Sequence, residues 1–196
     1  GRDELLSIIT DFESQPKKAS MRVSQLWSWI YCHGISSFDK MTNIDKNLRS
    51  QLQKFMTISR PIIEKKEISN DGTTKYLFCL EDRSKIETVF IPEEKRSTLC
   101  ISSQVGCTLN CSFCHTGTQK LVRNLSAQEI VGQVIAVYDD LDLWKKIKSS
   151  EGTSSFFEVI TNIVFMGMGE PLLNYKEVKK ACNVLMDNKG LDFSRR

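Results

Sequence analysis

The spacing of apolar residues predicts helices in the first 60 positions. Residues 26–31 place apolar side chains at helical intervals, and Gly34 behind them is typical of a helix end. Residues 41–56 show the same spacing after a predicted N-cap at Asn43. Four residues of this second helix form one apolar stripe that is expected in the core: Leu48, Leu52, Phe55 and Met56. The pattern indicates a small helical domain.

From Arg60 onward the pattern changes to that of strands. Three segments rich in β-branched and aromatic residues follow one another: residues 60–69, 74–80 and 85–92. The turn sequence at residues 70–72 separates the first two, and a turn around Asp82 separates the last two. We expect an antiparallel meander, followed after a charged turn by a short apolar strand at residues 98–103.

The rest of the chain alternates between helix and strand. A capping box of Ser126 and Glu129 begins a strongly apolar helix. A polar loop over residues 145–155, a strand at residues 162–166 and a helix over residues 175–190 are predicted after it. This order favours a parallel α/β unit. The predicted domain boundaries divide the chain into residues 1–60, 61–96 and 97–196.

Composition narrows the class of protein. The chain has 196 residues, of which 40% are hydrophobic and 26% charged, so it is globular rather than disordered. It contains no apolar run of the roughly 18 residues needed for a membrane span and no signal-peptide pattern, so a cytoplasmic protein without a membrane partner is expected. Its seven cysteines are an odd number with three in a cluster, which favours reduced thiols over a disulfide framework.

The charge is uneven along the chain. Residues 15–68 carry ten Lys or Arg against four Asp or Glu, an excess of six positive charges, while the whole chain has a net charge of +3. The excess favours an anionic partner for the N-terminal part, although a solvated face is the commoner cause of such an imbalance.

Three cysteines form the clearest chemical motif. Cys107, Cys111 and Cys114 have the spacing C-x3-C-x2-C. A structural zinc site normally has four protein ligands, whereas a [4Fe–4S] cluster held by three cysteines keeps one iron open to a substrate or cofactor. An iron–sulfur cluster is therefore predicted, and a zinc site closed by His115 is the alternative.

Other candidate residues are less specific when taken alone. The glycine-rich turn at residues 167–171 follows a predicted strand, where α/β folds bind ligands, but short glycine motifs are also ordinary turns. By itself Glu87 would be a solvent-facing residue of an edge strand, and Cys100 would be plain core. Lys120 and Arg123 would be surface charges.

Two longer stretches resemble a known family. The segments "SSQVGCTLNCSFCHTGTQKLVRNLSAQEIVGQV" and "MGMGEPLLN" are similar to the RlmN/Cfr family of radical S-adenosylmethionine (SAM) RNA adenine methyltransferases, and the resemblance extends over essentially the whole chain. It implies an α/β fold: the N-terminal portion of a partial (β/α)6 radical SAM barrel, preceded by a small helical RNA-binding domain and an antiparallel β meander.

The resemblance also implies roles for individual residues. The three clustered cysteines, Cys107, Cys111 and Cys114, would hold a [4Fe–4S] cluster whose open iron binds SAM. Gly169 and Glu170 would contact the methionine moiety of SAM. In the family, one SAM methylates a cysteine near the C-terminus, and a second SAM is cleaved to a radical that activates this methyl group for addition to adenine. Cys100 would resolve the protein–RNA link by forming a disulfide, and Glu87 would accept a proton.

The implied activity is methylation of adenine C2 in 23S ribosomal RNA and in transfer RNA, with electrons from a flavodoxin- or ferredoxin-type protein. Methylation at C8 is the alternative within the family, and a non-catalytic zinc-dependent RNA-binding module is the alternative outside it. Cys182 lies too early to be the methyl-carrying cysteine, so residues 1–196 alone are expected to be inactive. The oligomeric state and the exact target nucleotide stay open.

Overall fold

The computed structural model describes residues 1–94, 96–109, 111–144 and 160–193. The chain forms two compact units: Gly1–Ser59 with the segment that starts at Asn183, and Arg60–Cys182. The polar loop predicted at residues 145–155 lies outside the described residues. The division into three domains made from the sequence stays a prediction.

The first unit is helical. It contains α1 (Arg2–Thr10), α2 (Pro16–Tyr31), the 3-10 helix η1 (Phe38–Lys40) and α3 (Lys46–Phe55). The helix α2 starts with proline at its first position and ends before Gly34, whose φ of 65° is left-handed, as expected of a C-terminal stop. The centre of the unit is one apolar cluster, formed by Ile9, Ala19, Val23, Leu26, Phe38, Met41, Ile44, Leu48 and Leu52.

Two details of α3 differ from the prediction. Its N-cap is Asp45, because this carboxylate accepts hydrogen bonds from the N–H groups of Asn47 at 2.9 Å and Leu48 at 3.2 Å. The side chain of Asn43 instead accepts one from the Trp29 indole at 2.6 Å. Phe55 is 72% exposed rather than core, since it is the last residue of the helix and lies past the apolar cluster.

The second unit is built on a five-stranded sheet with the order β1-β2-β3-β4-β7. The strands are β1 (Ile62–Ile68), β2 (Thr74–Cys79), β3 (Lys85–Pro92), β4 (Ser97–Cys100) and β7 (Asn162–Val164). The first four pair antiparallel, and β7 pairs parallel to β4. The predicted meander and the predicted parallel pair are both confirmed, and β4 joins them into one mostly antiparallel sheet. The strand β7 is shorter than predicted.

One face of the sheet is buried under the helix α4 (Ala127–Asp140), which begins with the predicted capping box. Contacts at its C-terminal end and at its middle hold the helix there: the Tyr76 hydroxyl donates to Asp140 at 2.8 Å, and the Thr88 hydroxyl donates to Gln133 at 2.8 Å. The fully buried side chains on this side include Tyr76, Phe78, Ile86 and Leu99. Alternate residues on the opposite face of β2, β3 and β4 are partly exposed, so the sheet has one covered and one open face.

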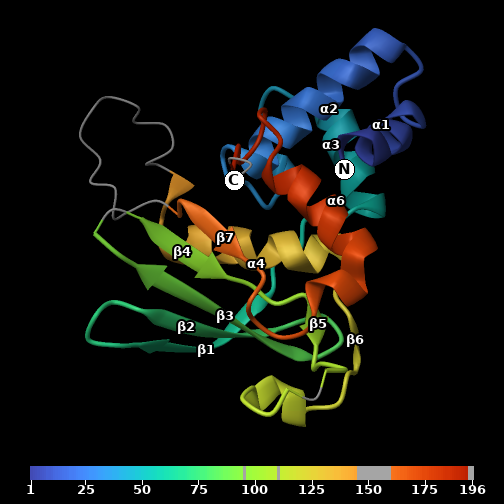
Figure 1. Ribbon diagram of the computed structural model, residues 1–196. Helices are drawn as coiled ribbons and strands as arrows, with labels where there is room; N and C mark the ends of the chain where they lie inside the picture. The colour runs from blue at the N-terminus through green and yellow to red at the C-terminus, as the bar shows by residue number, and fades with distance from the viewer. Residues whose placement is uncertain (95, 110, 145–159, 194–196) are drawn as a thin grey trace. The chain divides into compact units, whose positions relative to one another are not determined.

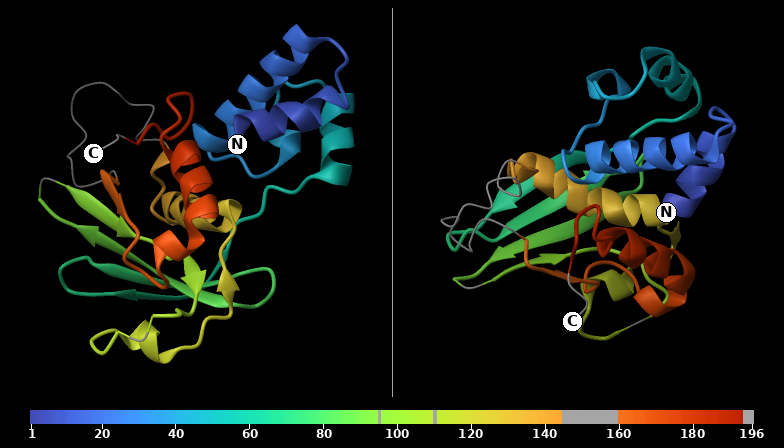
Figure 2. Two further views of the ribbon diagram at one scale, coloured as in Figure 1. Left: turned by 45° about the vertical axis from the view of Figure 1, so that its right-hand side comes forward. Right: turned by 90° about the horizontal axis from the view of Figure 1, so that it is seen from above.

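The remaining elements follow the carboxyl ends of β4 and β7. A two-stranded ribbon of β5 (Gln104–Val105) and β6 (Arg123–Asn124) carries a loop with the 3-10 helix η2 (His115–Thr118). The chain continues after β7 through η4 (Pro171–Asn174) into α6 (Tyr175–Leu185). Figures 1 and 2 show the loop with η2 projecting beyond β5 and β6. Among the described residues, no helix is both long and apolar enough to cross a membrane.

Candidate functional site

The segments that follow β4 and β7 run side by side. The N–H of Ile101 donates to the Val164 carbonyl at 2.9 Å, and the N–H of Gly167 donates to the Ile101 carbonyl at 3.1 Å. The N–H of Ser103 donates to the Met168 carbonyl at 2.8 Å. The two predicted motifs therefore begin at the carboxyl ends of adjacent parallel strands, where α/β folds place ligands.

The glycine turn (residues 167–171) is shaped by close backbone packing. Gly169 has a φ of 92°, and a Cβ at this position would lie 2.4 Å from the Cβ of Gln104. The N–H of Glu170 donates to Gln104 Oε1 at 2.9 Å, and its carboxylate accepts from the Leu172 N–H at 3.0 Å, which caps η4. The glycine is required by the fold at this point. The predicted SAM contacts of Gly169 and Glu170 stay a prediction.

Buried amides tie this turn to the ribbon. Gln104 is fully buried, and its Nε2 donates to Asn124 Oδ1 in β6 at 2.8 Å. Asn174 in η4 donates to the carbonyls of Ser103 and Leu125, both at 2.8 Å. Neither amide was predicted from the sequence, although a polar residue such as Gln104 directly after an apolar strand was a usable signal.

The cysteine loop (residues 106–122) is held at its base. The Val122 N–H donates to the Val105 carbonyl at 2.8 Å, and the Cys107 N–H to the Gln119 carbonyl at 3.4 Å. Gly106 has a φ of 75°, and a Cβ there would lie 2.2 Å from the Lys120 carbonyl oxygen. The glycine directly before Cys107 thus lets the two sides of the loop approach each other.

Inside the loop the three predicted cluster ligands are half-buried free thiols. The Cys114 N–H donates to the Cys111 carbonyl at 3.1 Å, and the Leu109 N–H donates to the Cys107 sulfur at 3.3 Å. Within the described ranges, no three His, Cys, Asp or Glu side chains form a group that could hold a metal ion, so neither the cysteines nor His115 are gathered into a ligand set.

The chemistry of the loop nevertheless fits an iron–sulfur cluster. It offers three soft thiol donors on one short segment, and a backbone N–H already directed at one sulfur is a usual tuning contact of such clusters. The assignment of Cys107, Cys111 and Cys114 as cluster ligands stays a prediction.

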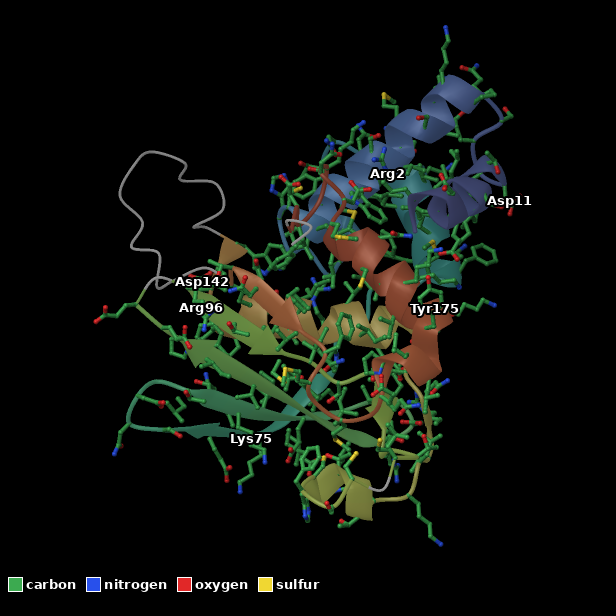
Figure 3. The ribbon with its side chains drawn as sticks, viewed as in Figure 1. Arg2, Asp11, Lys75, Arg96, Asp142 and Tyr175 are labelled. Atoms are coloured by element: carbon green, nitrogen blue, oxygen red, sulfur yellow. The ribbon has the colours of Figure 1, made fainter. Side chains whose placement is uncertain are left out.

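Glu87 and Cys100 lie on the open face of the sheet. Cys100 pairs with Val89, two residues from Glu87 along β3, so the two side chains share one face as diagonal neighbours. The carboxylate of Glu87 forms an ion pair with Lys75 of β2 at 2.7 Å (Lys75 is labelled in Figure 3). Glu87 therefore faces solvent in part, as expected from its residue type, but β3 is an interior strand and the expected edge position is wrong.

The Cys100 thiol is half-buried on this open face, so the expectation of plain core is wrong. Burial raises its pKa, although a hydrogen bond with the Met166 backbone acts in the opposite direction. A thiol with a raised pKa is protonated at neutral pH and needs a base before it can attack. Cys100 is a free thiol, so the disulfide implied for it is not present in the structure.

Arg123 is part of an ion-pair network rather than an isolated surface charge. Its guanidinium contacts both oxygens of Glu129 at 2.7 and 2.9 Å, and its Nε donates to Asp82 at 2.7 Å. The hydrogen bond to Glu129 and then that to Asp82 raise the pKa of Arg123, and the contact with Arg123 lowers the pKa of Asp82. Burial acts to raise the pKa of Glu129, but the hydrogen bonds from Arg123 and Ser126 outweigh it and lower the pKa. Arg123 thus ties β6 to α4 and to the β2–β3 turn.

Comparison with known proteins shows which family the chain resembles. Residues 6–58 match the family described as "Ribosomal RNA large subunit methyltransferase N-terminal domain". Curated proteins named "Dual-specificity RNA methyltransferase RlmN" from Ruegeria pomeroyi and Paracoccus denitrificans are each 49% identical to the chain over 195 residues, and one from Cereibacter sphaeroides is 48% identical. These alignments cover 100% of this chain and 49% of each relative.

The resemblance to the RlmN family is confirmed. The chain spans about half the length of the RlmN proteins that it matches. A solved structure described as a radical SAM methyltransferase from Sphaerobacter thermophilus has a TM-score of 0.79 and 34% sequence identity, and the match covers 98% of this chain and 52% of that one. The match to the RlmN proteins and the match to the Sphaerobacter thermophilus structure both extend over the helical unit and the sheet.

Proposed function

We propose that the protein is a radical SAM RNA methyltransferase that methylates C2 of adenine in 23S ribosomal RNA and in transfer RNA. One observation carries this proposal: β4 and β7 end side by side, so the segment that leads into the cysteine loop is bonded to the glycine turn, next to the open face with Glu87 and Cys100. The RlmN relatives supply the substrate class, and the resemblance supplies the position on the base.

In this proposal the cysteine loop and the glycine turn together bind the cofactors. Cys107, Cys111 and Cys114 would hold a [4Fe–4S] cluster, which supplies the electron for cleavage of SAM and is itself reduced by a flavodoxin- or ferredoxin-type protein. The glycine turn would present its backbone at Gly169 to the methionine end of SAM. One carboxylate oxygen of Glu170 caps η4, and its second oxygen can accept from the SAM amino group.

Cys100 and Glu87 would complete the reaction on the open face. The Cys100 thiol loses its proton and attacks the sulfur of the cysteine that links protein and RNA. A sulfur–sulfur bond forms as the carbon–sulfur bond breaks, and the electron pair stays with the carbon, which takes up a proton to become the methyl group. Glu87 would accept the proton that leaves the methylated carbon of the base, and the one electron that the radical adduct must also lose would return to the cluster. Lys75 keeps a positive charge beside this carboxylate.

The helical unit would bind the RNA through its phosphates. Five lysines between residues 1 and 59 are exposed: Lys17, Lys18, Lys40, Lys46 and Lys54. Contacts of this kind release counterions, so the logarithm of the affinity for RNA should fall linearly with the logarithm of salt concentration. A salt-independent affinity would contradict this part of the proposal.

Replacing Cys100 with Ser in the full-length protein tests the proposal. The variant should form the protein–RNA link and fail to release it, because no thiol is present to attack the linking sulfur. Denaturing electrophoresis should show a shifted band that disappears with ribonuclease. Cys79→Ser is the matched control, since Cys79 is a free thiol in the neighbouring part of the same sheet. Normal RNA methylation without the shifted band in Cys100→Ser would overturn the role of Cys100.

Two measurements separate the alternatives. Mass spectrometry of nucleosides from modified RNA distinguishes 2-methyladenosine from 8-methyladenosine. Metal analysis after anaerobic reconstitution distinguishes an iron–sulfur enzyme from a zinc-dependent binding module: iron and sulfide support the proposal, and colourless protein with one zinc contradicts it.

A further inference from the structure

The hydroxyl of Ser102 joins two parts of the candidate site. It donates to the Glu87 carbonyl in β3 at 2.6 Å, and it accepts a hydrogen bond from the Met168 N–H in the glycine turn at 2.9 Å. Ser102 is fully buried. A single oxygen therefore fixes the strand that carries Glu87 relative to the turn that carries Gly169 and Glu170.

The side chain of Gln133 in α4 holds the main chain of Ser102. Its Oε1 accepts from the Ser102 N–H at 2.8 Å, and its Nε2 donates to the Ser102 carbonyl at 3.0 Å, as the main chain of a neighbouring strand would. The same Oε1 accepts from the Thr88 hydroxyl at 2.8 Å. Gln133 is fully buried, and moving Ser102 would leave these buried polar atoms unpaired.

The adjacent Ser103 shows that burial alone does not create this link. It is 1% exposed, but its hydroxyl lies 3.5 Å from the Met168 carbonyl, at the limit of a hydrogen bond. Its close contacts come from the main chain: the N–H donates to Met168, and the carbonyl accepts from Asn174. Two neighbouring buried serines therefore differ in whether the hydroxyl bridges two segments.

We infer that Ser102, held by Gln133, is a positioning residue that sets the Glu87 strand against the glycine turn. It acts through the main chain of Glu87 and Met168 and does not itself meet the substrate. The inference rests on the proposed function, in which Glu87 accepts a proton and the turn binds SAM. Ser102 is thus the residue that keeps Glu87, the proton acceptor, aligned with the glycine turn that binds SAM.

Ser102→Ala and Ser103→Ala in the full-length protein test this inference. Hydrogen–deuterium exchange without SAM should be faster at the Met168 amide in Ser102→Ala, because the acceptor of that N–H is gone, and should match the wild type in Ser103→Ala. The KM for SAM should rise about tenfold in Ser102→Ala, corresponding to about 1.4 kcal/mol, while the KM for RNA stays within about twofold.

Gln133→Met is the second variant, because it keeps the length of the side chain and removes the amide. Faster exchange at both Ser102 and Met168 is expected. Unchanged Met168 exchange in Ser102→Ala, an equal change in Ser103→Ala, or a uniform increase over β3 and α4 would each overturn the inference. A wild-type protein that does not bind SAM would contradict the proposed function, whereas exchange measured without SAM still tests the positioning role.

Discussion

The two loops that follow β4 and β7 are held in different ways. The glycine turn is bonded to the segment at residues 101–104 through Gly167, Met168 and Glu170. The cysteine loop is held at its base, whereas the main-chain hydrogen bonds donated by Cys114, Gly117 and Gln119 within it reach only three residues back along the chain. The exposed fractions follow the same division: Met168 is 8% exposed and Phe113 is 91% exposed.

The two loops therefore obtain their shape from different interactions. The polypeptide itself determines the shape of the glycine turn, because buried serine and glutamine side chains satisfy its backbone. The cysteine loop has a fixed base and three thiols, and a metal cluster bound by those thiols, as proposed, would add the remaining constraints. Substitutions of the cysteines should therefore change the metal content. Substitutions in the glycine turn should change the stability.

The largest effect is expected from the cysteines. Replacing Cys107, Cys111 or Cys114 with Ala should reduce iron per chain to background after anaerobic reconstitution and abolish RNA methylation, because each removes one of three predicted ligands. Cys182→Ala is the control, since this free thiol lies in α6, and it should retain its iron. Undiminished iron in all three loop variants would contradict the assignment.

Gly169→Ala should change stability instead. A side chain at a φ of 92°, with its Cβ 2.4 Å from that of Gln104, combines backbone strain and overpacking. The free energy of unfolding should fall by about 1–3 kcal/mol, measured in urea. Leu172→Ala, at a position 74% exposed, should stay within about 0.5 kcal/mol of the wild type. Equal unfolding curves for both variants would show that the turn is not tightly packed.

Arg123→Gln tests the base of the cysteine loop through its pH dependence. The folded-state pKa values of Asp82 and Glu129 are lowered, so their contribution to stability is present above the ordinary carboxyl pKa values of about 4 and is lost as pH falls through the lowered values. The variant should melt a few degrees below the wild type at pH 7, and the difference should shrink on acidification. Lys120→Gln, at an exposed position of the same loop, should show no such convergence. A constant difference from pH 7 to pH 3 would rule out the ion pairs as its cause.

Phe113→Ser should have the smallest effect on folding. Its ring is 91% exposed in the cysteine loop, so the free energy of unfolding should change by less than about 0.5 kcal/mol. Thermal unfolding checks this directly. A clear loss of stability would show that the ring is packed in solution and that the two loops are more alike than the structure indicates.

Elements with strong local signals could be predicted from the sequence. The turns at residues 70–72 and around Asp82 identified the hairpins, and Ser126 with Glu129 identified the start of α4. The order strand, helix, strand predicted the parallel pair of β4 and β7. The position of Cys100 and Glu87 on one face could not be derived in this way, because it depends on the register between β3 and β4.

Features that depend on distant contacts were missed. The helix α1 has nine residues, too few to be stable without tertiary packing, and the sequence pattern did not predict it. Ser102 and Gln133 are 31 residues apart, and each appears as one polar residue in an apolar stretch. Only the position of α4 across the sheet makes them partners, so residue type alone could not indicate their role.

The double pairing of β4 has a consequence for the order of folding. On one side β4 joins β3 through a short turn, so β1 to β4 can form by local steps. On the other side it pairs with β7, and the contact between Ser97 and Thr161 must close a separation of 64 residues. Loop closure over that distance costs more entropy and is slower. During synthesis we therefore expect the meander to form first, and the alignment of the two loops to form last, when β7 joins β4.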